Sequence, residues 1–146
     1  MRNYIAYGSN MDERQMQFRC PDAKLIGKGK IKNWRLMFKG SQSGKYATIE
    51  PEKNFKVPIL LWKISAEDEK NLDRYEGCPS FYYKKEIEVE MENGESTTGM
   101  VYIMHEERKL GLPTAYYYEV LLTAYLKFGF DEKILEDAIE YSDKKA

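Results

Sequence analysis

The sequence contains few of the residues that bind metal ions or form disulfide frameworks. Among 146 residues there are two cysteines, Cys20 and Cys78, and one histidine, His105. Two thiols are too few for a disulfide framework that stabilises a small fold. The two cysteines and the histidine also show no spacing typical of zinc ligands. We therefore expect reduced thiols, no metal site and a cytoplasmic location.

The sequence also lacks a charge excess and a long apolar run. Twenty-three basic and 24 acidic residues leave a net charge of −1, so no overall field attracts nucleic acid or an acidic membrane. No stretch reaches the ~20 apolar residues that span a bilayer. The N-terminus lacks the basic-then-apolar pattern of a secretion signal. Nucleic-acid and membrane partners are accordingly not expected.

One segment, residues 23–49, carries seven basic and no acidic residues. Lys28, Lys30 and Lys32 alternate there, which places them on one face of a strand. A solvated strand face is the favoured interpretation, and an anion-binding or nucleic-acid patch is the alternative. The neutral charge of the whole chain argues against the alternative.

What the sequence has in abundance is tyrosine, with twelve residues beside six phenylalanines and two tryptophans. Tyrosine has an apolar face and a polar tip, which suit both a core and a polar pocket. Tyr116, Tyr117 and Tyr118 fall within an expected helix and cannot all face the core. At least one should face a pocket or a partner chain, which leaves a homodimer open.

The length suits a single domain over residues 1–146 with one core. Consecutive strands favour an α+β fold over a doubly wound sheet, with mostly antiparallel strands curled into a barrel and helices outside. A cap at Asn10 or Asp12 should start the first helix, with Met16 and Phe18 facing inward. Pro51 should end a strand. The expected strands are 3–7, 24–39 (one or two strands), 45–50, 57–64, 82–91 and 97–104, and the expected helices are 11–18, 65–76, 115–128 and 131–142.

Glu76 is a candidate catalytic residue at the end of the helix over 65–76. Ser65 gives the pattern of a helix start, and Gly77 is placed to end the helix. A carboxylate at the negative end of a helix, beside apolar residues such as Phe81, should have a raised pKa. A solvent-exposed glutamate is the alternative.

A second candidate is the Gly8-Ser9-Asn10 turn that follows the first strand. Its backbone N–H groups and hydroxyl could hold an anion, although the same residues also form ordinary turns. A cysteine nucleophile is not expected. Each cysteine precedes a proline, and the one histidine falls in an expected loop.

Several segments, in order, resemble the γ-glutamylcyclotransferase-like family, which includes γ-glutamylamine cyclotransferases and the plant avirulence-induced-protein-like proteins. The resemblance extends from residue 4 to about residue 130 and implies a small mixed β-barrel with outer helices. The segments that carry it are Tyr4–Asn10 (YIAYGSN), Trp34–Phe38 (WRLMF), Tyr46–Pro51 (YATIEP), Leu60–Ile64 (LLWKI), Leu72–Gly77 (LDRYEG) and Phe81–Lys85 (FYYKK).

The resemblance also implies a reaction, in which a γ-glutamyl compound cyclises to 5-oxoproline and releases its amine. The α-amine would attack the γ-carbonyl with Glu76 as general acid and base, and no cofactor is implied. Tyr117, or Tyr116 if the alignment shifts by one, would contact the small-molecule substrate. A ligand-binding or interaction module of the same fold is the alternative. The other substrate-binding residues implied are Tyr4, Ile5, Ala6, Tyr7, Gly8, Ser9 and Asn10.

The sequence departs from the family near Ile59. Family members often have glycine there, whereas this chain reads Val57-Pro58-Ile59. A bulkier residue could narrow the pocket or move the strand, which bears on substrate choice. We expect the loops 40–46 and 105–113 to set specificity.

Overall fold

Two long strands form the frame of the protein. In the computed structural model, which describes residues 1–146, β2 (Lys24–Ser41) and β3 (Gly44–Ile64) form one antiparallel hairpin. The remaining strands are shorter. They are β1 (Arg2–Ala6), β4 (Tyr82–Met91), β5 (Ser96–Met104) and β6 (Lys109–Leu110).

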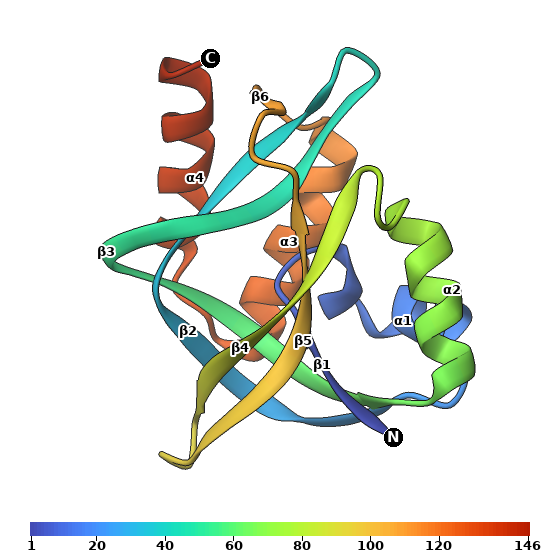
Figure 1. The fold of residues 1–146 in the computed structure, drawn as a ribbon. Helices are drawn as coiled ribbons and strands as arrows, with labels where there is room; N and C mark the ends of the chain where they lie inside the picture. The colour runs from blue at the N-terminus through green and yellow to red at the C-terminus, as the bar shows by residue number, and fades with distance from the viewer.

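Five of the strands close into a barrel. The order is β3-β1-β5-β4-β2, and β2 pairs back onto β3 (Figure 1). The β1–β5 pair is parallel and the other pairs are antiparallel. This confirms the predicted mixed, mostly antiparallel barrel. β6, which was not predicted, adds to the outer part of β2 at Lys39 and Gly40.

The prediction that Pro51 ends a strand is wrong. β3 continues through Pro51, which lies opposite Trp34 of β2. β1 pairs only with the last part of β3, from Leu60 onward, so the second edge of β3 is unpaired at Pro51. Proline is tolerated at such an edge because its missing N–H is not needed there. Nearby, the pairing of β2 with β3 shifts register between Lys32 and Trp34. Asn33 and Asn54 have positive φ values there, of 64° and 72°.

The first helix is preceded by a short 3-10 turn. η1 (Ser9–Met11) leads into α1 (Glu13–Arg19), and the Asp12 carboxylate caps α1 by accepting from the amides of Arg14 and Gln15. Met16 is fully buried as predicted, but Phe18 is 88% exposed. Two residues apart on a helix point about 200° apart, so Met16 and Phe18 cannot share the inner face.

Helix α2 (Ala66–Glu76) has the predicted boundaries. The Ser65 hydroxyl and the Asp68 carboxylate form a reciprocal capping box at its start. Gly77 ends the helix in the left-handed conformation, with φ of 63°. α1 and α2 lie side by side outside the barrel, where the Asn71 side chain donates to the Arg19 carbonyl at 3.0 Å (Figure 1).

The last two helices cover other parts of the barrel. α3 (Ala115–Phe128) ends at Gly129, and α4 (Glu132–Lys144) packs along β2. The buried Ser142 hydroxyl accepts a hydrogen bond from the Phe38 amide at 2.9 Å, which joins α4 to the strand. The buried apolar side chains form one continuous cluster of strand and helix residues. No helix has the length and apolar character that crossing a membrane requires.

Candidate active site

A cavity of about 490 Å³ opens where β1 ends, and it brings together residues far apart in the sequence. Its lining includes eight of the nine predicted site residues. Ala6, the ninth, is buried and does not line the cavity. The eight are Tyr4, Ile5, Tyr7, Gly8, Ser9, Asn10, Glu76 and Tyr117.

Glu76 contributes the cavity's only carboxyl group. It is the last residue of α2, and its carboxyl group makes no hydrogen bond and no ion pair within the protein. Burial raises its pKa from 4.5 to about 7, and the positive charge of Arg19 opposes the shift. The side chain keeps part of its surface accessible because it lines the cavity. A pKa near neutrality lets this group both accept and donate a proton.

Buried tyrosines surround Glu76. Burial, reinforced by the Glu76 charge, raises the pKa values of Tyr4, Tyr7 and Tyr82 well above 10, so their hydroxyls stay protonated. Tyr7 donates to the Tyr102 carbonyl at 2.7 Å, and Tyr82 donates to the Ala47 carbonyl at 2.8 Å. These bonds fix the aromatic walls of the cavity.

Tyr117, and not Tyr116, lies at the cavity. Its ring lines the cavity, and its hydroxyl accepts from the Ala47 amide at 3.1 Å. Tyr116 is 75% exposed, so the alternative alignment places that residue outside the cavity.

The turn after β1 presents free backbone donors. The amide groups of Tyr7 and Gly8 donate no hydrogen bond within the protein, and both residues line the cavity. A Cβ atom at Gly8 would lie 3.3 Å from the Tyr117 hydroxyl and 3.4 Å from the Ala47 Cβ. The absence of a side chain therefore keeps this backbone open to a ligand.

The Asn10 side chain, in contrast, is hydrogen-bonded within the protein. Its amide nitrogen donates to the Tyr4 hydroxyl at 2.9 Å, and its oxygen accepts from Arg19 at 2.5 Å. Arg19 was not predicted as a site residue. Its guanidinium lies 3.4 Å from the centre of the Tyr75 ring and also reaches the Ser9 hydroxyl at 3.4 Å. One arginine thus connects the turn to the residue next to Glu76.

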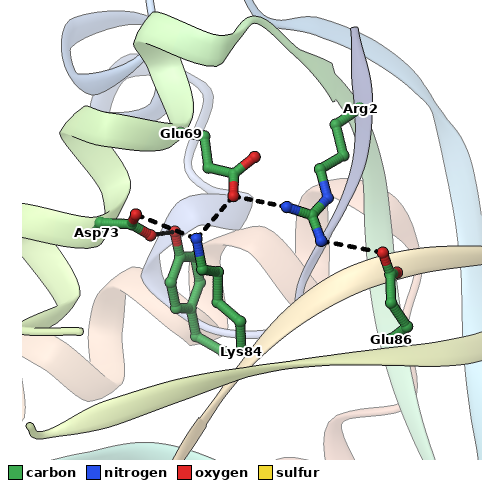
Figure 2. Close-up of polar contacts among 6 residues, drawn as sticks. Arg2, Glu69, Asp73, Lys84 and Glu86 are labelled. Atoms are coloured by element: carbon green, nitrogen blue, oxygen red, sulfur yellow. Dashed lines mark hydrogen bonds and ion pairs between the residues drawn. The ribbon is translucent and has the colours of Figure 1, made fainter. Parts of the chain in front are cut away.

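A network of charged side chains fixes α2 to the strands (Figure 2). Lys84 of β4 pairs with Glu69 at 2.7 Å and with Asp73 at 3.1 Å, and both carboxylates belong to α2. Arg2 of β1 pairs with the same Glu69 at 2.6 Å and with Glu86 at 3.0 Å. The helix that ends at Glu76 is therefore anchored to two strands along one side.

The outer part of the cavity comes from the two loops expected to set specificity. Tyr46 and Arg108 line it, as do two serines at the β2–β3 turn, Ser41 and Ser43. The sequence indicated the loops but not these residues. The folded β2–β3 hairpin brings Ser41, Ser43 and Tyr46 to the cavity, and the segment between β5 and β6 brings Arg108. Ile59, where the sequence departs from the family pattern, is fully buried and does not line the cavity. The departure therefore lies in the hydrophobic core.

The cysteines lie outside the cavity. Cys20 is buried, its thiol donates to the Asp68 carbonyl, and burial raises its pKa to about 12. Burial also raises the pKa of Cys78. Thiols with raised pKa values are poor nucleophiles at neutral pH. No group of three or more His, Cys, Asp or Glu side chains is close enough to hold a metal ion.

Comparison with known proteins identifies the family of the chain. The sequence pattern of the family described as "Gamma-glutamyl cyclotransferase, AIG2-like" matches residues 4–119, which include every predicted site residue. The chain belongs to this family. The membership confirms the resemblance that the sequence motifs indicated.

Individual relatives of the family are distant. Human "Gamma-glutamylcyclotransferase" is 29% identical over 109 residues, and the bovine protein of the same name is 28% identical over 109 residues. These alignments cover 69% of this chain and 58% of each relative, so the chain matches less than two thirds of their length.

Solved structures of similar fold extend the comparison. A structure titled "Gamma-glutamyl cyclotransferase" superimposes with a TM-score of 0.84 at 24% identity, over 94% of this chain and 85% of that one. An uncharacterized human protein gives a TM-score of 0.84 at 25% identity over the same shares. The barrel with outer helices is therefore the fold of these neighbours too.

Proposed function

We propose that the protein converts a γ-glutamyl compound into 5-oxoproline and a free amine. The observation that carries the proposal is the Glu76 carboxyl group, which lines the cavity without a partner and has a pKa of about 7. Family membership supports the reaction type. The cavity supplies a proton acceptor, backbone donors and an aromatic enclosure in one place.

The first step is transfer of a proton from the substrate's α-ammonium group to Glu76. An α-amino group has a pKa near ~8, and an ordinary glutamate near ~4.3, so the transfer would be uphill by roughly 5 kcal/mol. With a Glu76 pKa of about 7, the gap is about one unit, which corresponds to about 1.4 kcal/mol. Burial of Glu76 thus removes most of that cost.

The free amine then attacks the γ-carbonyl carbon of the same molecule. A new C–N bond closes the five-membered ring and leaves the ring nitrogen with an extra proton. The bond to the leaving amine breaks as Glu76 returns its proton to the leaving nitrogen. Glu76, again a carboxylate, then takes the extra proton from the ring nitrogen and passes it to the released amine, which departs as an ammonium ion. Because the attack is intramolecular, the protein's task is to hold the chain folded in attack geometry. Tyr82 and Tyr117 line the space in which the substrate would adopt this folded conformation.

Charge that develops on the carbonyl oxygen needs a donor. The unpartnered amides of Tyr7 and Gly8 are suited to this role, or to holding the glutamyl carboxylate. A single preorganised donor to a developing oxyanion typically contributes ~3 kcal/mol. The free donors and the carboxyl group together distinguish this cavity from an ordinary surface hollow.

The decisive experiment measures 5-oxoproline release from a panel of γ-glutamyl compounds. We expect release by the wild type and loss of release in Glu76→Gln. Glu67→Gln, an exposed substitution on the same helix, is the matched control and should keep wild-type activity. Equal release by Glu76→Gln would remove this residue from the mechanism. Ligand-induced thermal stabilisation without any release would favour a binding module instead.

A further inference from the structure

Arg108 is the one cationic side chain of the cavity that has no polar partner. The lining contains a single acid, Glu76, and two arginines, Arg74 and Arg108. Arg74 donates to the Asn71 side chain at 2.8 Å. The Arg108 guanidinium, half-buried, makes no hydrogen bond or ion pair and lies 4.4 Å from the centre of the Phe81 ring.

A series of aromatic contacts separates Arg108 from the turn at Gly8. Phe81 contacts Tyr46, with ring centres 6.4 Å apart, and Tyr46 contacts Tyr117 at 5.4 Å. The Tyr117 hydroxyl in turn lies against Gly8. Three aromatic residues of the cavity lining, Phe81, Tyr46 and Tyr117, therefore lie in successive contact between Arg108 and Gly8.

The backbone around Arg108 is fixed on several sides. The Lys39 ammonium donates to the Glu106 carbonyl at 2.9 Å, and the Tyr83 hydroxyl donates to the Glu106 carboxylate. The His105 ring is within 2.7 Å of the Pro79 carbonyl. Such anchoring fixes the backbone from which the Arg108 side chain extends over the Phe81 ring.

Other polar groups gather at the same end of the cavity. β6 pairs Lys109 with Gly40, which brings the β2–β3 turn next to Arg108. Ser41 and Ser43 of that turn line the cavity, and their hydroxyls hydrogen-bond to each other at 2.7 Å. An unpaired guanidinium in the lining of a polar cavity suits a carboxylate, which arginine can bind through two parallel hydrogen bonds.

We propose that Arg108 is a specificity-determining residue that binds an anionic group on the leaving amine. This inference rests on the proposed function. A γ-glutamyl amino acid carries two carboxylates, one on the glutamyl part and one on the part that leaves. With the glutamyl end at the Gly8 turn and Glu76, the second carboxylate meets Arg108. Amino-acid leaving groups are then preferred over neutral amines of the same shape.

The test compares two substrates that differ only in this charge, γ-glutamyl-alanine and γ-glutamyl-alaninamide. A charge-assisted hydrogen bond predicts that wild-type kcat/KM favours the carboxylate by about tenfold to 100-fold, mainly through KM. In Arg108→Gln the ratio should fall toward one, because the loss falls on the carboxylate substrate. Arg108→Lys should retain part of the preference. Arg14→Gln, an exposed charge removal outside the cavity, should keep the wild-type ratio.

A wild-type ratio near one, or an unchanged ratio in Arg108→Gln, would overturn the inference while leaving the proposed function standing. If the wild type releases 5-oxoproline from no compound of the panel, the proposed function fails. In that case, or if only these two compounds are not turned over, calorimetric binding decides the role of Arg108. Comparing Glu76→Gln with Glu76→Gln/Arg108→Gln, we expect γ-glutamyl-alanine to lose affinity about tenfold or more on loss of the guanidinium. Equal affinities would reject the carboxylate site.

Discussion

The Tyr102 hydroxyl donates a hydrogen bond of 2.6 Å to the Asp73 carboxylate, and this bond joins the cavity wall to the helix that carries Glu76. Asp73 also accepts from Lys84, so the tyrosine extends the ion-pair network of Figure 2 into the cavity. Burial raises the pKa of Tyr102, and the negative charge of Asp73 raises it further. Tyr102 therefore remains a donor at neutral pH.

Removing this donor should loosen α2. We expect Tyr102→Phe to lower the free energy of unfolding by about 1.5–3 kcal/mol, the usual contribution of a hydrogen bond to a charged group. Urea denaturation measures the difference. Glu67→Gln, which removes an exposed pair of 3.9 Å with Lys70, is the control and should cost less than about 0.5 kcal/mol. Equal losses in both variants would contradict a special role for the buried bond.

The raised pKa of Glu76 makes wild-type stability depend on pH. An unfolded chain releases this proton near 4.5, whereas the folded protein holds it up to about 7. The free energy of unfolding therefore falls progressively as the pH rises from 4.5 to 7, and it stays lower above pH 7. A shift of about 2.5 units corresponds to about 3 kcal/mol.

Glu76→Gln removes this loss of stability. We expect the variant to be more stable than the wild type at pH 8, by up to about 3 kcal/mol, and to converge with it below pH 4.5. Thermal melts across pH 4–8 measure the difference. A constant offset at all pH values would show that Glu76 does not titrate differently in the folded protein.

The same pKa should govern catalysis. If Glu76 is the proton acceptor, kcat/KM should rise with pH through about 7 rather than 4.5. Arg19 lowers the pKa of Glu76, so Arg19→Gln should move the rise to higher pH. Asn10→Ala removes the Arg19 contact but keeps the charge, and the rise should stay near 7. The pH profile of 5-oxoproline release distinguishes these outcomes.

A structural feature could be predicted from the sequence where residues close in the chain determine it. Helix α2 is defined by Ser65 and Gly77, residues within or next to its ends, and its boundaries follow correctly. The raised pKa of Glu76 follows from its place at the helix end and its apolar neighbours in the chain. Other features depend on distant residues. Pro51 remains in a strand because no strand pairs with its other edge. Arg19 contacts the Ser9-Asn10 turn, and Arg108 lines the cavity, only through tertiary packing.

Gly8 should not tolerate a side chain. The Cβ of Gly8→Ala would crowd the Tyr117 hydroxyl and push it away from the cavity wall. Because small displacements of substrate-positioning groups are costly, we expect kcat/KM to fall roughly tenfold to 100-fold. The double variant Gly8→Ala/Tyr117→Phe removes the crowded atom and should recover part of the loss. No recovery would show that the turn, rather than the contact, is sensitive.

Ile59, where family members often have glycine, should affect stability without affecting specificity. The residue is fully buried and does not line the cavity. We expect Ile59→Ala to lower the free energy of unfolding by about 2–5 kcal/mol, because it leaves a void in the core. The relative kcat/KM values across the γ-glutamyl panel should not change. An altered substrate order would instead place this strand in control of the pocket.

The barrel closes where the parallel strands β1 and β5 meet, with Tyr4 opposite Met100. Tyr4 lies at this β1–β5 junction and also lines the cavity. The chain must therefore pair its first strand with one that lies nearly a hundred residues later. We therefore expect the cavity to form only after β5 has paired with β1 and α3, which carries Tyr117, has packed in place. Amide hydrogens of β1 should exchange mainly through opening of the barrel.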